Sequence, residues 1–432
     1  MNKMFFNQFQ SVYKIDEYWV VVDFLKNTVY KIKGENLNIF FEHDENYDKL
    51  SEMLDDRLND QEKDTSLYVT VITDFKCNMN CIYCYEQGIV LPESEVNEKN
   101  PEKIVRFIED KWKTGIYKDI SINILGGEPL MSHNMEFIST LCEKINQLGA
   151  NIRYSITTNG LNVVNYIDDI LKWKIGNVQI TLDGVGNGHN ERRRPNDNRI
   201  DGFQKISQGI ELLLDSGCFV TLRMNIDRNN IDQIKPLADY IINRKWVTKN
   251  FDAYIYPITT SGNDKYLIQD SELEIFNMAM DTIGKDIQSV ERIFKLDFHG
   301  IDYLRCLIDK KIPKIKTKFC GVERNQYVIS DNGKMYACWW GIGENEFDIG
   351  NLGEDRYEAK EKIDRLKQRS TIKIKRCQRC KFKYLCGGGC AYREWMNKKS
   401  TNQGNCAEFD LLFEKYLRSR IKEIEEYVPE MK

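Results

Sequence analysis

The sequence lacks the features that would place the protein in a membrane, outside the cell or on nucleic acid. No uninterrupted apolar stretch approaches the roughly 20 residues that a membrane-spanning helix needs. The first residues have neither the apolar core nor the small-residue cleavage site of a signal peptide. The formal net charge of the 432-residue chain is only −4, so no overall basic field favours nucleic acid. We therefore expect a cytoplasmic protein with no membrane and no nucleic-acid partner.

Histidine is scarce, and His43, His133 and His299 show no metal-ligand spacing, so we assign them no role. Cysteine is plentiful by comparison. The chain has 13 cysteines, and disulfides are not expected in a chain without an export signal, because the cytosol keeps thiols reduced. Three of them lie within residues 77–84 and seven between Cys320 and Cys406. Such clustering predicts metal ligands.

The first cluster follows an apolar, β-branched run at residues 67–73 that predicts a buried strand. Its spacing is Cys77-x3-Cys81-x2-Cys84. Soft thiolates select zinc, copper(I) or iron–sulfur, and a three-ligand loop leaves one coordination position open. The spacing alone allows either a centre with a vacancy for chemistry or a zinc knuckle that takes a fourth ligand from elsewhere.

Residues 66–258 alternate between strand and helix patterns. We predict strands at 67–73, 119–125, 152–157, 177–182, 219–226 and 252–257, and helices near 101–113, 134–148, 162–173, 203–216 and 230–243. Six βα repeats predict an α/β fold with a parallel sheet rolled into a partial (β/α)6 barrel, because right-handed crossovers keep consecutive strands parallel. The active site of such a barrel lies at the C-terminal strand ends, where the cysteine loop is expected.

The cysteine loop, with the aromatic Tyr83 before its last cysteine, resembles the hallmark of the radical S-adenosylmethionine (SAM) enzymes. The resemblance implies that Cys77, Cys81 and Cys84 hold three irons of a [4Fe–4S] cluster and that SAM chelates the fourth. It also implies a reducing partner, such as flavodoxin or ferredoxin, whose electron cleaves SAM to a 5′-deoxyadenosyl radical. Further motifs in the family's order after successive strands favour this interpretation over the zinc knuckle.

Those motifs imply contacts with SAM. Paired glycines let a backbone approach a ligand closely, and Gly126-Gly127-Glu128-Pro129 resembles the segment that meets the SAM amino group. His189 to Arg194 resembles the family's His-Asp-x-x-Arg segment with Asn190 in place of Asp, so Arg193 would face the SAM carboxylate unless these arginines form a solvated loop. The expected cofactor contacts are Tyr83, Gly126, Gly127, Glu128, Thr158, Asn159, Thr181, Asp183, Arg193 and Arg223, and the candidate catalytic bases are Asp183 and Tyr256.

The second group of cysteines exceeds the needs of one zinc site, which is satisfied by four ligands. Its pattern resembles the SPASM domain, a C-terminal extension of peptide-modifying radical SAM enzymes. The resemblance implies two auxiliary [4Fe–4S] clusters, with Cys377, Cys380, Cys386 and Cys406 holding the distal one and Cys320, Cys338 and Cys390 the nearer one. The place of a further family cysteine is occupied by Lys and Ile. Either Cys306 or a non-cysteine ligand closes the nearer cluster, or one of its irons stays open and could bind a substrate thiolate.

We expect four segments: an N-terminal α+β module at 1–65, the barrel at 66–260, a helical linker at 261–318, and the SPASM domain with a C-terminal helix at 319–432. The module has a hairpin pattern at 18–32 and a helical pattern at 50–58, and it either binds a leader peptide at a sheet edge or caps the barrel. The basic stretch 310–318 is expected to be a solvated connector, with attraction of an acidic peptide as the alternative.

The resemblance implies an enzyme that takes hydrogen from a ribosomally made precursor peptide and installs a thioether or carbon–carbon crosslink. The enzymatic alternative is an anaerobic sulfatase maturase that forms formylglycine. Those enzymes have an Asp base after the cysteine that corresponds to Cys338, whereas this chain has Trp339 and Trp340. A cluster-bearing electron carrier or sensor is the non-enzyme alternative, which the Gly-Gly-Glu-Pro motif disfavours.

Overall fold

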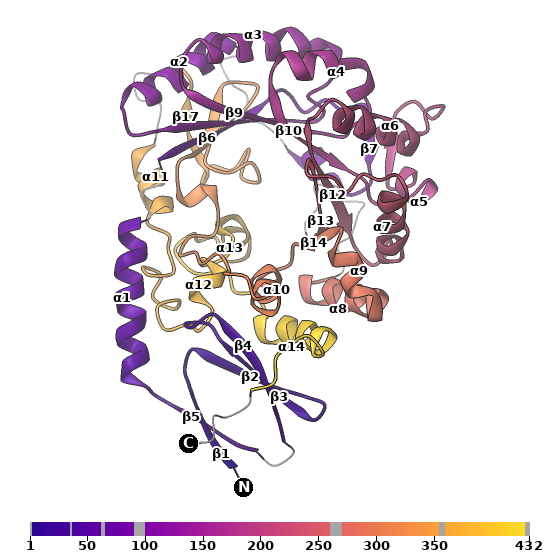
Figure 1. Cartoon of the computed structure of the whole chain (residues 1–432). Helices are drawn as coiled ribbons and strands as arrows, with labels where there is room; N and C mark the ends of the chain where they lie inside the picture. Colours follow the sequence, from indigo (N-terminus) through magenta and orange to yellow (C-terminus); the bar gives the residue numbers. More distant parts are fainter. Residues whose placement is uncertain are drawn as a thin grey trace.

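The computed structural model describes residues 2–34, 37–61, 65–89, 100–259, 270–353 and 359–427. Its centre is a ten-stranded sheet in the order β14-β13-β12-β10-β9-β8-β6-β15-β16-β17, which curves around an open middle (Figure 1). Six consecutive parallel strands form its main part: β6 (Ser66–Ile72), β8 (Asp119–Leu125), β9 (Asn151–Thr158), β10 (Ile175–Thr181), β12 (Phe219–Ile226) and β13 (Phe251–Pro257). The predicted partial (β/α)6 barrel is confirmed.

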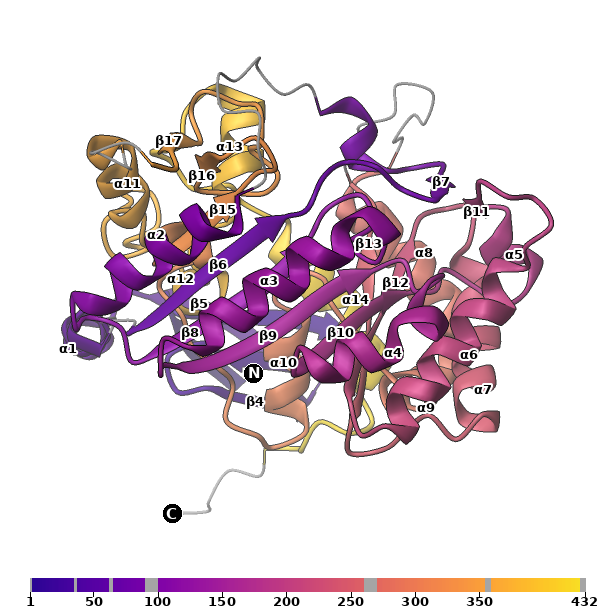
Figure 2. The ribbon, with the colours of Figure 1, turned by 90° about the horizontal axis from the view of Figure 1, so that it is seen from above.

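The predicted helices connect these strands and cover the outer face of the sheet. They are α2 (Pro101–Lys113), α3 (Met135–Asn146), α4 (Val163–Lys172), α6 (Gly202–Asp215) and α7 (Ile234–Asn243). Figure 2 shows α2, α3 and α4 lying along β6, β8 and β9. Asn100 caps the start of α2 by accepting a hydrogen bond from the backbone N–H of Lys103 at 3.1 Å, and Asp201 does the same for α6 at Gln204, at 3.2 Å.

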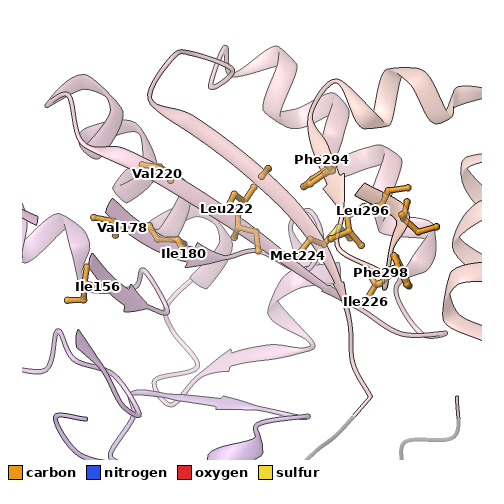
Figure 3. Close-up of a cluster of buried hydrophobic side chains, with 14 of the residues drawn as sticks. Ile156, Val178, Ile180, Val220, Leu222, Met224, Ile226, Phe294, Leu296 and Phe298 are labelled. Atoms are coloured by element: carbon orange, nitrogen blue, oxygen red, sulfur yellow. The ribbon is translucent and has the colours of Figure 1, made fainter. Parts of the chain in front are cut away.

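The core lies between the sheet and these helices. Side chains alternate along each strand, and in the middle of β9, β10 and β12 apolar residues at every second position are buried toward the helices. Figure 3 shows Ile156, Val178, Ile180, Val220, Leu222 and Met224 in this layer, with Phe294, Leu296 and Phe298 continuing it. The residues between them point to the inside of the barrel and are therefore free to carry polar side chains.

Residues 270–308 correct the expectation of a helical linker. After α8 (Glu272–Ile283) and α9 (Ile287–Glu291), the short strand β14 (Phe294–Leu296) pairs in parallel with β13 and extends the barrel sheet, and α10 (Ile301–Ile308) follows. A three-residue strand is too short to show an alternating pattern, which is why sequence analysis missed it. The connector at 310–318 is only partly solvated, because Pro313 and Thr317 are buried.

The C-terminal cysteine region is attached to the other edge of the barrel sheet. β15 (Gln326–Ile329) pairs in parallel with β6, and β16 (Lys334–Tyr336) and β17 (Asp348–Asn351) continue the sheet in antiparallel fashion. The helices α11 (Lys360–Lys367), α12 (Lys383–Cys386), α13 (Ala391–Lys398) and α14 (Phe409–Arg420) complete this region. Nowhere in the described ranges is a helix long and apolar enough to cross a membrane.

The N-terminal residues form more strands than predicted. β1 (Asn2–Asn7) pairs in parallel with β5 (Leu37–Glu42), while β2 (Gln10–Ile15), β3 (Tyr18–Asp23) and β4 (Thr28–Lys33) form an antiparallel sheet that contains the predicted hairpin. Helix α1 (Glu45–Gln61) follows. These elements lie beside α10, α12 and α14 (Figure 1). The Phe24 ring packs against Phe382 at 5.1 Å and Phe413 at 6.0 Å, and Tyr384 donates a hydrogen bond to Asp55 at 2.9 Å.

Candidate active site

The three-cysteine loop follows the C-terminal end of β6, and its first cysteine, Cys77, lies five residues after Ile72. The thiols of Cys77, Cys81 and Cys84 are close enough to interact electrostatically with one another, and Asn159 Nδ2 donates to the sulfur of Cys77 at 3.5 Å. Burial raises the pKa of each thiol to about 11. The loop therefore holds protonated thiols until an electropositive centre displaces the protons, as expected of metal ligands.

A short antiparallel pair holds this loop in place. β7 (Met79–Cys81) pairs with β11 (Arg193–Pro195), and Arg193 lies opposite Cys81. The pairing brings Arg193 to the cysteines and buries it, and it also buries Arg192, whose guanidinium binds the Asp227 carboxylate at 3.2 and 2.7 Å. Arg194 alone of the three is exposed. The alternative of a solvated arginine loop is therefore wrong for Arg192 and Arg193.

The two glycines after β8 lie against the start of the cysteine loop. The N–H of Gly127 donates to the Asp74 carbonyl at 2.7 Å, and the N–H of Glu128 donates to the Lys76 carbonyl at 2.9 Å. A Cβ on Gly127 would lie 2.3 Å from the Lys76 carbonyl oxygen, so a side chain there has no room. Glycine is required at this position because two backbone segments touch.

Glu128 lies behind the cavity wall. Its fully buried carboxylate accepts hydrogen bonds from the N–H groups of Leu130 at 2.8 Å and Asn159 at 2.7 Å, and from the Thr158 hydroxyl at 2.7 Å. The carboxylate is thus occupied in joining the ends of β8 and β9. This placement does not support the expected direct contact between the Glu128 side chain and SAM.

A cavity of about 510 Å³ opens over the loop, at the C-terminal strand ends. The expected residues that line it are Cys77, Cys81, Cys84, Tyr83, Gly126, Gly127, Thr158, Asn159, Thr181, Arg193, Arg223 and Tyr256. The buried Nε atoms of Arg193 and Arg223 have no hydrogen-bond partner among the described residues. Buried, unpaired donors of positive charge fit an anionic group of a bound molecule.

Asp183 also lies behind the wall, where it supports Tyr83. Its fully buried carboxylate accepts hydrogen bonds from the Tyr83 hydroxyl and from the N–H of Asn225, the latter at 2.9 Å. The Tyr83 oxygen in turn accepts from Arg193 at 2.9 Å and from the Asn225 amide at 3.0 Å. Asp183 is therefore placed to position Tyr83 and not to meet a substrate, which argues against its expected roles as catalytic base and as direct SAM contact.

Several polar residues that line the inside of the barrel were not among the predicted site residues. They are Asn123, Ser155, Asn177, Gln179 and Tyr254. All but Asn177, which follows the exposed Gly176, occupy a strand position between two buried apolar residues, so the period-two alternation of β8, β9, β10 and β13 contained the signal. Asp297, directly after β14, was missed because that strand was not predicted.

A second cavity of about 490 Å³ adjoins the first and reaches the C-terminal cysteines. Tyr256, Asp297, Trp339 and Trp340 line both cavities. The Tyr85 ring of the cysteine loop packs on Trp340 with ring centroids 4.3 Å apart, and Trp340 stacks on Tyr392 at 6.1 Å. The cysteine loop and the C-terminal region are thus parts of one site.

The C-terminal thiols fall into two groups by their mutual electrostatic interactions. Cys320, Cys338 and Cys390 form one group, which lines the second cavity. Cys377, Cys380, Cys386 and Cys406 form the other, with Cys386 also lining that cavity. These are the two ligand sets that the resemblance implies. Cys306 lies on α10 among the charges of Asp302 and Arg305 and lines neither cavity, so its placement does not favour closing the nearer cluster.

The donor sets of the cysteine groups fit iron–sulfur clusters. In the described part of the chain, no three Cys, His, Asp or Glu side chains converge as the ligands of one metal ion would. Four thiolates around one zinc ion must meet at a single point, whereas a cubane cluster keeps its thiolates apart. All the donors in these groups are thiols, the residue type that holds such clusters.

Comparison with known proteins identifies the barrel. Residues 71–241 match the Radical SAM superfamily. The chain is 23% identical to radical SAM cyclopropyl synthase TigE of Paramaledivibacter caminithermalis, over 81% of this chain and 73% of TigE. It is 24% identical to the antilisterial bacteriocin subtilosin biosynthesis protein AlbA of Bacillus subtilis, over 78% of this chain and 70% of AlbA.

Solved structures share the fold. The structure of anSMEcpe with bound AdoMet superposes with a TM-score of 0.61 at 17% identity, covering 83% of this chain and 98% of that one. Streptococcus suis SuiB bound to S-adenosylmethionine superposes with a TM-score of 0.51 at 18% identity, covering 86% of this chain and 82% of that one. The radical SAM family uses a [4Fe–4S] cluster and SAM, and the cysteine-rich C-terminal region fits auxiliary clusters. Residues 71–241, which include the three-cysteine loop at the mouth of the barrel, therefore match the Radical SAM superfamily, and the chain as a whole is similar to TigE and AlbA.

Proposed function

We propose that the protein is a peptide maturase that removes hydrogen from a ribosomally made precursor peptide and installs an intramolecular thioether or carbon–carbon crosslink. The observation that carries the proposal is the continuity of the two cavities, which share Tyr256, Asp297, Trp339 and Trp340. A side chain of a bound peptide at this junction lies between the three-cysteine loop and Cys320, Cys338 and Cys390. The names of TigE and AlbA, a cyclopropyl synthase and a bacteriocin biosynthesis protein, agree with this class of substrate.

When bound, the cluster and SAM supply a 5′-deoxyadenosyl radical that takes a hydrogen atom from the substrate. In the proposed mechanism Cys77, Cys81 and Cys84 hold the cluster, and the unpaired Nε atoms of Arg193 and Arg223 attract the carboxylate of SAM. Polar side chains on the inside of the barrel hold the sugar and the peptide. The aromatic rings of Tyr85 and Trp340 close one wall and exclude water.

We propose that residues 1–65 bind the leader of the precursor. One edge of the β2–β3–β4 sheet is already paired, because the N–H of Lys31 donates to the Glu425 carbonyl at 2.8 Å and the N–H of Tyr427 donates to the Lys31 carbonyl at 2.7 Å. The edge strand β4 can therefore pair with an extended segment, as it does here with residues 425–427. A leader strand that added at this edge would displace residues 425–427.

Formation of formylglycine is the second candidate, favoured by the fold that the chain shares with almost the whole of anSMEcpe. The Trp residues after Cys338 disfavour it, since they cannot accept a proton. Incubating the reconstituted protein with SAM, reductant and the small peptide encoded beside its gene tests both candidates. A product lighter by two hydrogens, together with 5′-deoxyadenosine, is the result expected of a crosslinking enzyme. A formylglycine mass change on a sulfatase peptide would overturn it, and absence of SAM cleavage would favour an electron carrier.

A further inference from the structure

Asp297 occupies the junction between the two cavities. It directly follows β14, and its backbone N–H donates to the Ile255 carbonyl at 2.9 Å, which fixes it beside the end of β13. Its side chain lines the cavity over the three-cysteine loop and also the cavity beside Cys320, Cys338 and Cys390. Protein surrounds the carboxylate, yet the side chain is open to the cavity solvent. A substrate at the junction would therefore contact it.

The carboxylate of Asp297 has no bonding partner in the described part of the chain. It accepts no hydrogen bond and forms no ion pair within the described ranges, unlike Asp183 and Glu128. The titratable groups that face it are Arg223, Tyr254, Tyr256, Glu272, His299 and Lys316. Burial raises the pKa of Asp297, while the charge of Arg223 opposes this rise. A carboxylate with a raised pKa is a better proton acceptor near neutral pH than an ordinary one.

Its neighbours are engaged elsewhere. The Arg223 guanidinium lies over the Tyr256 ring, 4.2 Å from its centroid. His299 Nδ1 pairs with the Glu272 carboxylate at 2.6 Å, and Arg393 also reaches Glu272 at 3.4 Å. Burial raises the pKa of Tyr256, which disfavours this phenol as the catalytic base. Of the two carboxylates at this place, Glu272 is paired with His299 and Arg393, whereas Asp297 has no partner among the described residues.

We propose that Asp297 is a catalytic residue of the proposed peptide-modifying reaction, the acceptor of the proton that the peptide loses as its new bond forms. The inference rests on the proposed function. The peptide loses one hydrogen atom to the deoxyadenosyl radical, which becomes 5′-deoxyadenosine. A second hydrogen would leave as a proton to Asp297 and an electron, which an oxidised iron–sulfur cluster held by Cys320, Cys338 and Cys390 would accept, so that the product is lighter by two hydrogens.

The test compares Asp297→Asn with the wild type, with Asp297→Glu and with Asp252→Asn. Asp252 lies at the opposite end of the same strand pair, where it forms an ion pair with Lys295, so its loss should leave turnover unchanged. For Asp297→Asn we expect 5′-deoxyadenosine to form within about threefold of the wild-type rate, while crosslinked product falls by about 100-fold. Asp297→Glu should restore part of the product. The pH profile supplies a second measurement: product formation by the wild type should rise with pH as the Asp297 carboxyl deprotonates, and Asp297→Asn should lose this limb.

Two results would overturn the inference: product from Asp297→Asn in the wild-type ratio to 5′-deoxyadenosine, or an equal loss of both, which would indicate a structural role. Failure of the proposed function looks different. In that case the wild type itself makes no product lighter by two hydrogens, and the comparison of variants never arises.

Discussion

The Tyr83 hydroxyl donates a hydrogen bond to the buried Asp183 carboxylate, which joins the three-cysteine loop to the end of β10. The same oxygen accepts from Arg193 and from Asn225. Four elements of the barrel mouth thus meet at one phenol. The residue before the last cysteine therefore positions the loop as well as lining the cavity.

Tyr83→Phe should remove the hydrogen bonds that join these elements at the Tyr83 hydroxyl. The substitution leaves Arg193, Asn225 and Asp183 each without one partner, and an unsatisfied buried polar group costs about 1–3 kcal/mol. We expect a lower unfolding temperature and weaker SAM binding, measured by calorimetry on anaerobically reconstituted protein. Tyr30→Phe, in the N-terminal sheet, is the matched control. Equal SAM affinity in both variants would contradict the positioning role of Tyr83.

Cys81→Ala should abolish SAM cleavage. Cys81 is one of three thiols for the proposed SAM-binding cluster, and a loop with two thiols cannot hold three irons. Iron and acid-labile sulfide should fall but not vanish, because the C-terminal cysteines remain. Cys142→Ala removes a buried thiol far from this loop, on α3, and should retain both cleavage and iron content. Cleavage by Cys81→Ala at the wild-type rate would exclude the loop as the site.

Gly127→Ala should displace the start of the cysteine loop. The added Cβ would lie 2.3 Å from the Lys76 carbonyl oxygen, a distance that a backbone atom cannot relieve without moving the loop. We expect lost SAM cleavage and a destabilised fold. Gly176→Ala is the control, since its Cβ would lie 3.6 Å from the nearest atom. A fully active Gly127→Ala enzyme would show that the close approach of the two segments is unimportant.

Stability should decrease as the pH falls below about 6.5, the ordinary pKa of histidine. His189 is fully buried, and burial together with Arg193 and Arg192 lowers its pKa far below that value. Its Nδ1 accepts a hydrogen bond from the N–H of Asp183 at 3.2 Å, so the neutral ring is part of the fold. Below pH 6.5 only the unfolded chain takes up the proton, at a cost to folding of up to about 1.4 kcal/mol per pH unit.

The measurement is the unfolding temperature between pH 7.5 and 5.5 for the wild type and for His189→Gln, which keeps an acceptor. The variant should lose part of the pH dependence. His43→Gln is the control, because the His43 side chain is exposed. An unchanged pH dependence in His189→Gln would show that other groups cause it.

Local patterns predicted the barrel closely because each repeat has its own signal. The predicted strands at 119–125 and 219–226 and the helix at 101–113 match β8, β12 and α2 to the residue. Amphipathic periodicity and caps such as Asn100 act over a few residues, so they can be recognised without the rest of the chain. β14 has only three residues and shows no such period. Neither this strand nor Asp297, which follows it, was therefore predicted.

Side-chain orientation was less predictable. Asp183 and Glu128 follow strands at the right edge, but their carboxylates turn inward and bind neighbouring backbone and hydroxyl groups. Arg193 and Arg194 are adjacent in the chain, yet pairing of β11 with β7 buries the first and exposes the second. Which face of a short strand is buried depends on a partner that lies more than 100 residues away.

The amino-acid sequence by itself determined the barrel repeats, the three-cysteine loop at a strand end and the division of the remaining cysteines, because spacing and periodicity are local properties of the chain. Only the tertiary structure decided that the two cavities meet, that Asp297 stands uncommitted at their junction, and that Asp183 and Glu128 lie behind the wall. Those relationships arise from the closure of the sheet and the docking of the C-terminal region on β6, which bring together residues far apart in the sequence.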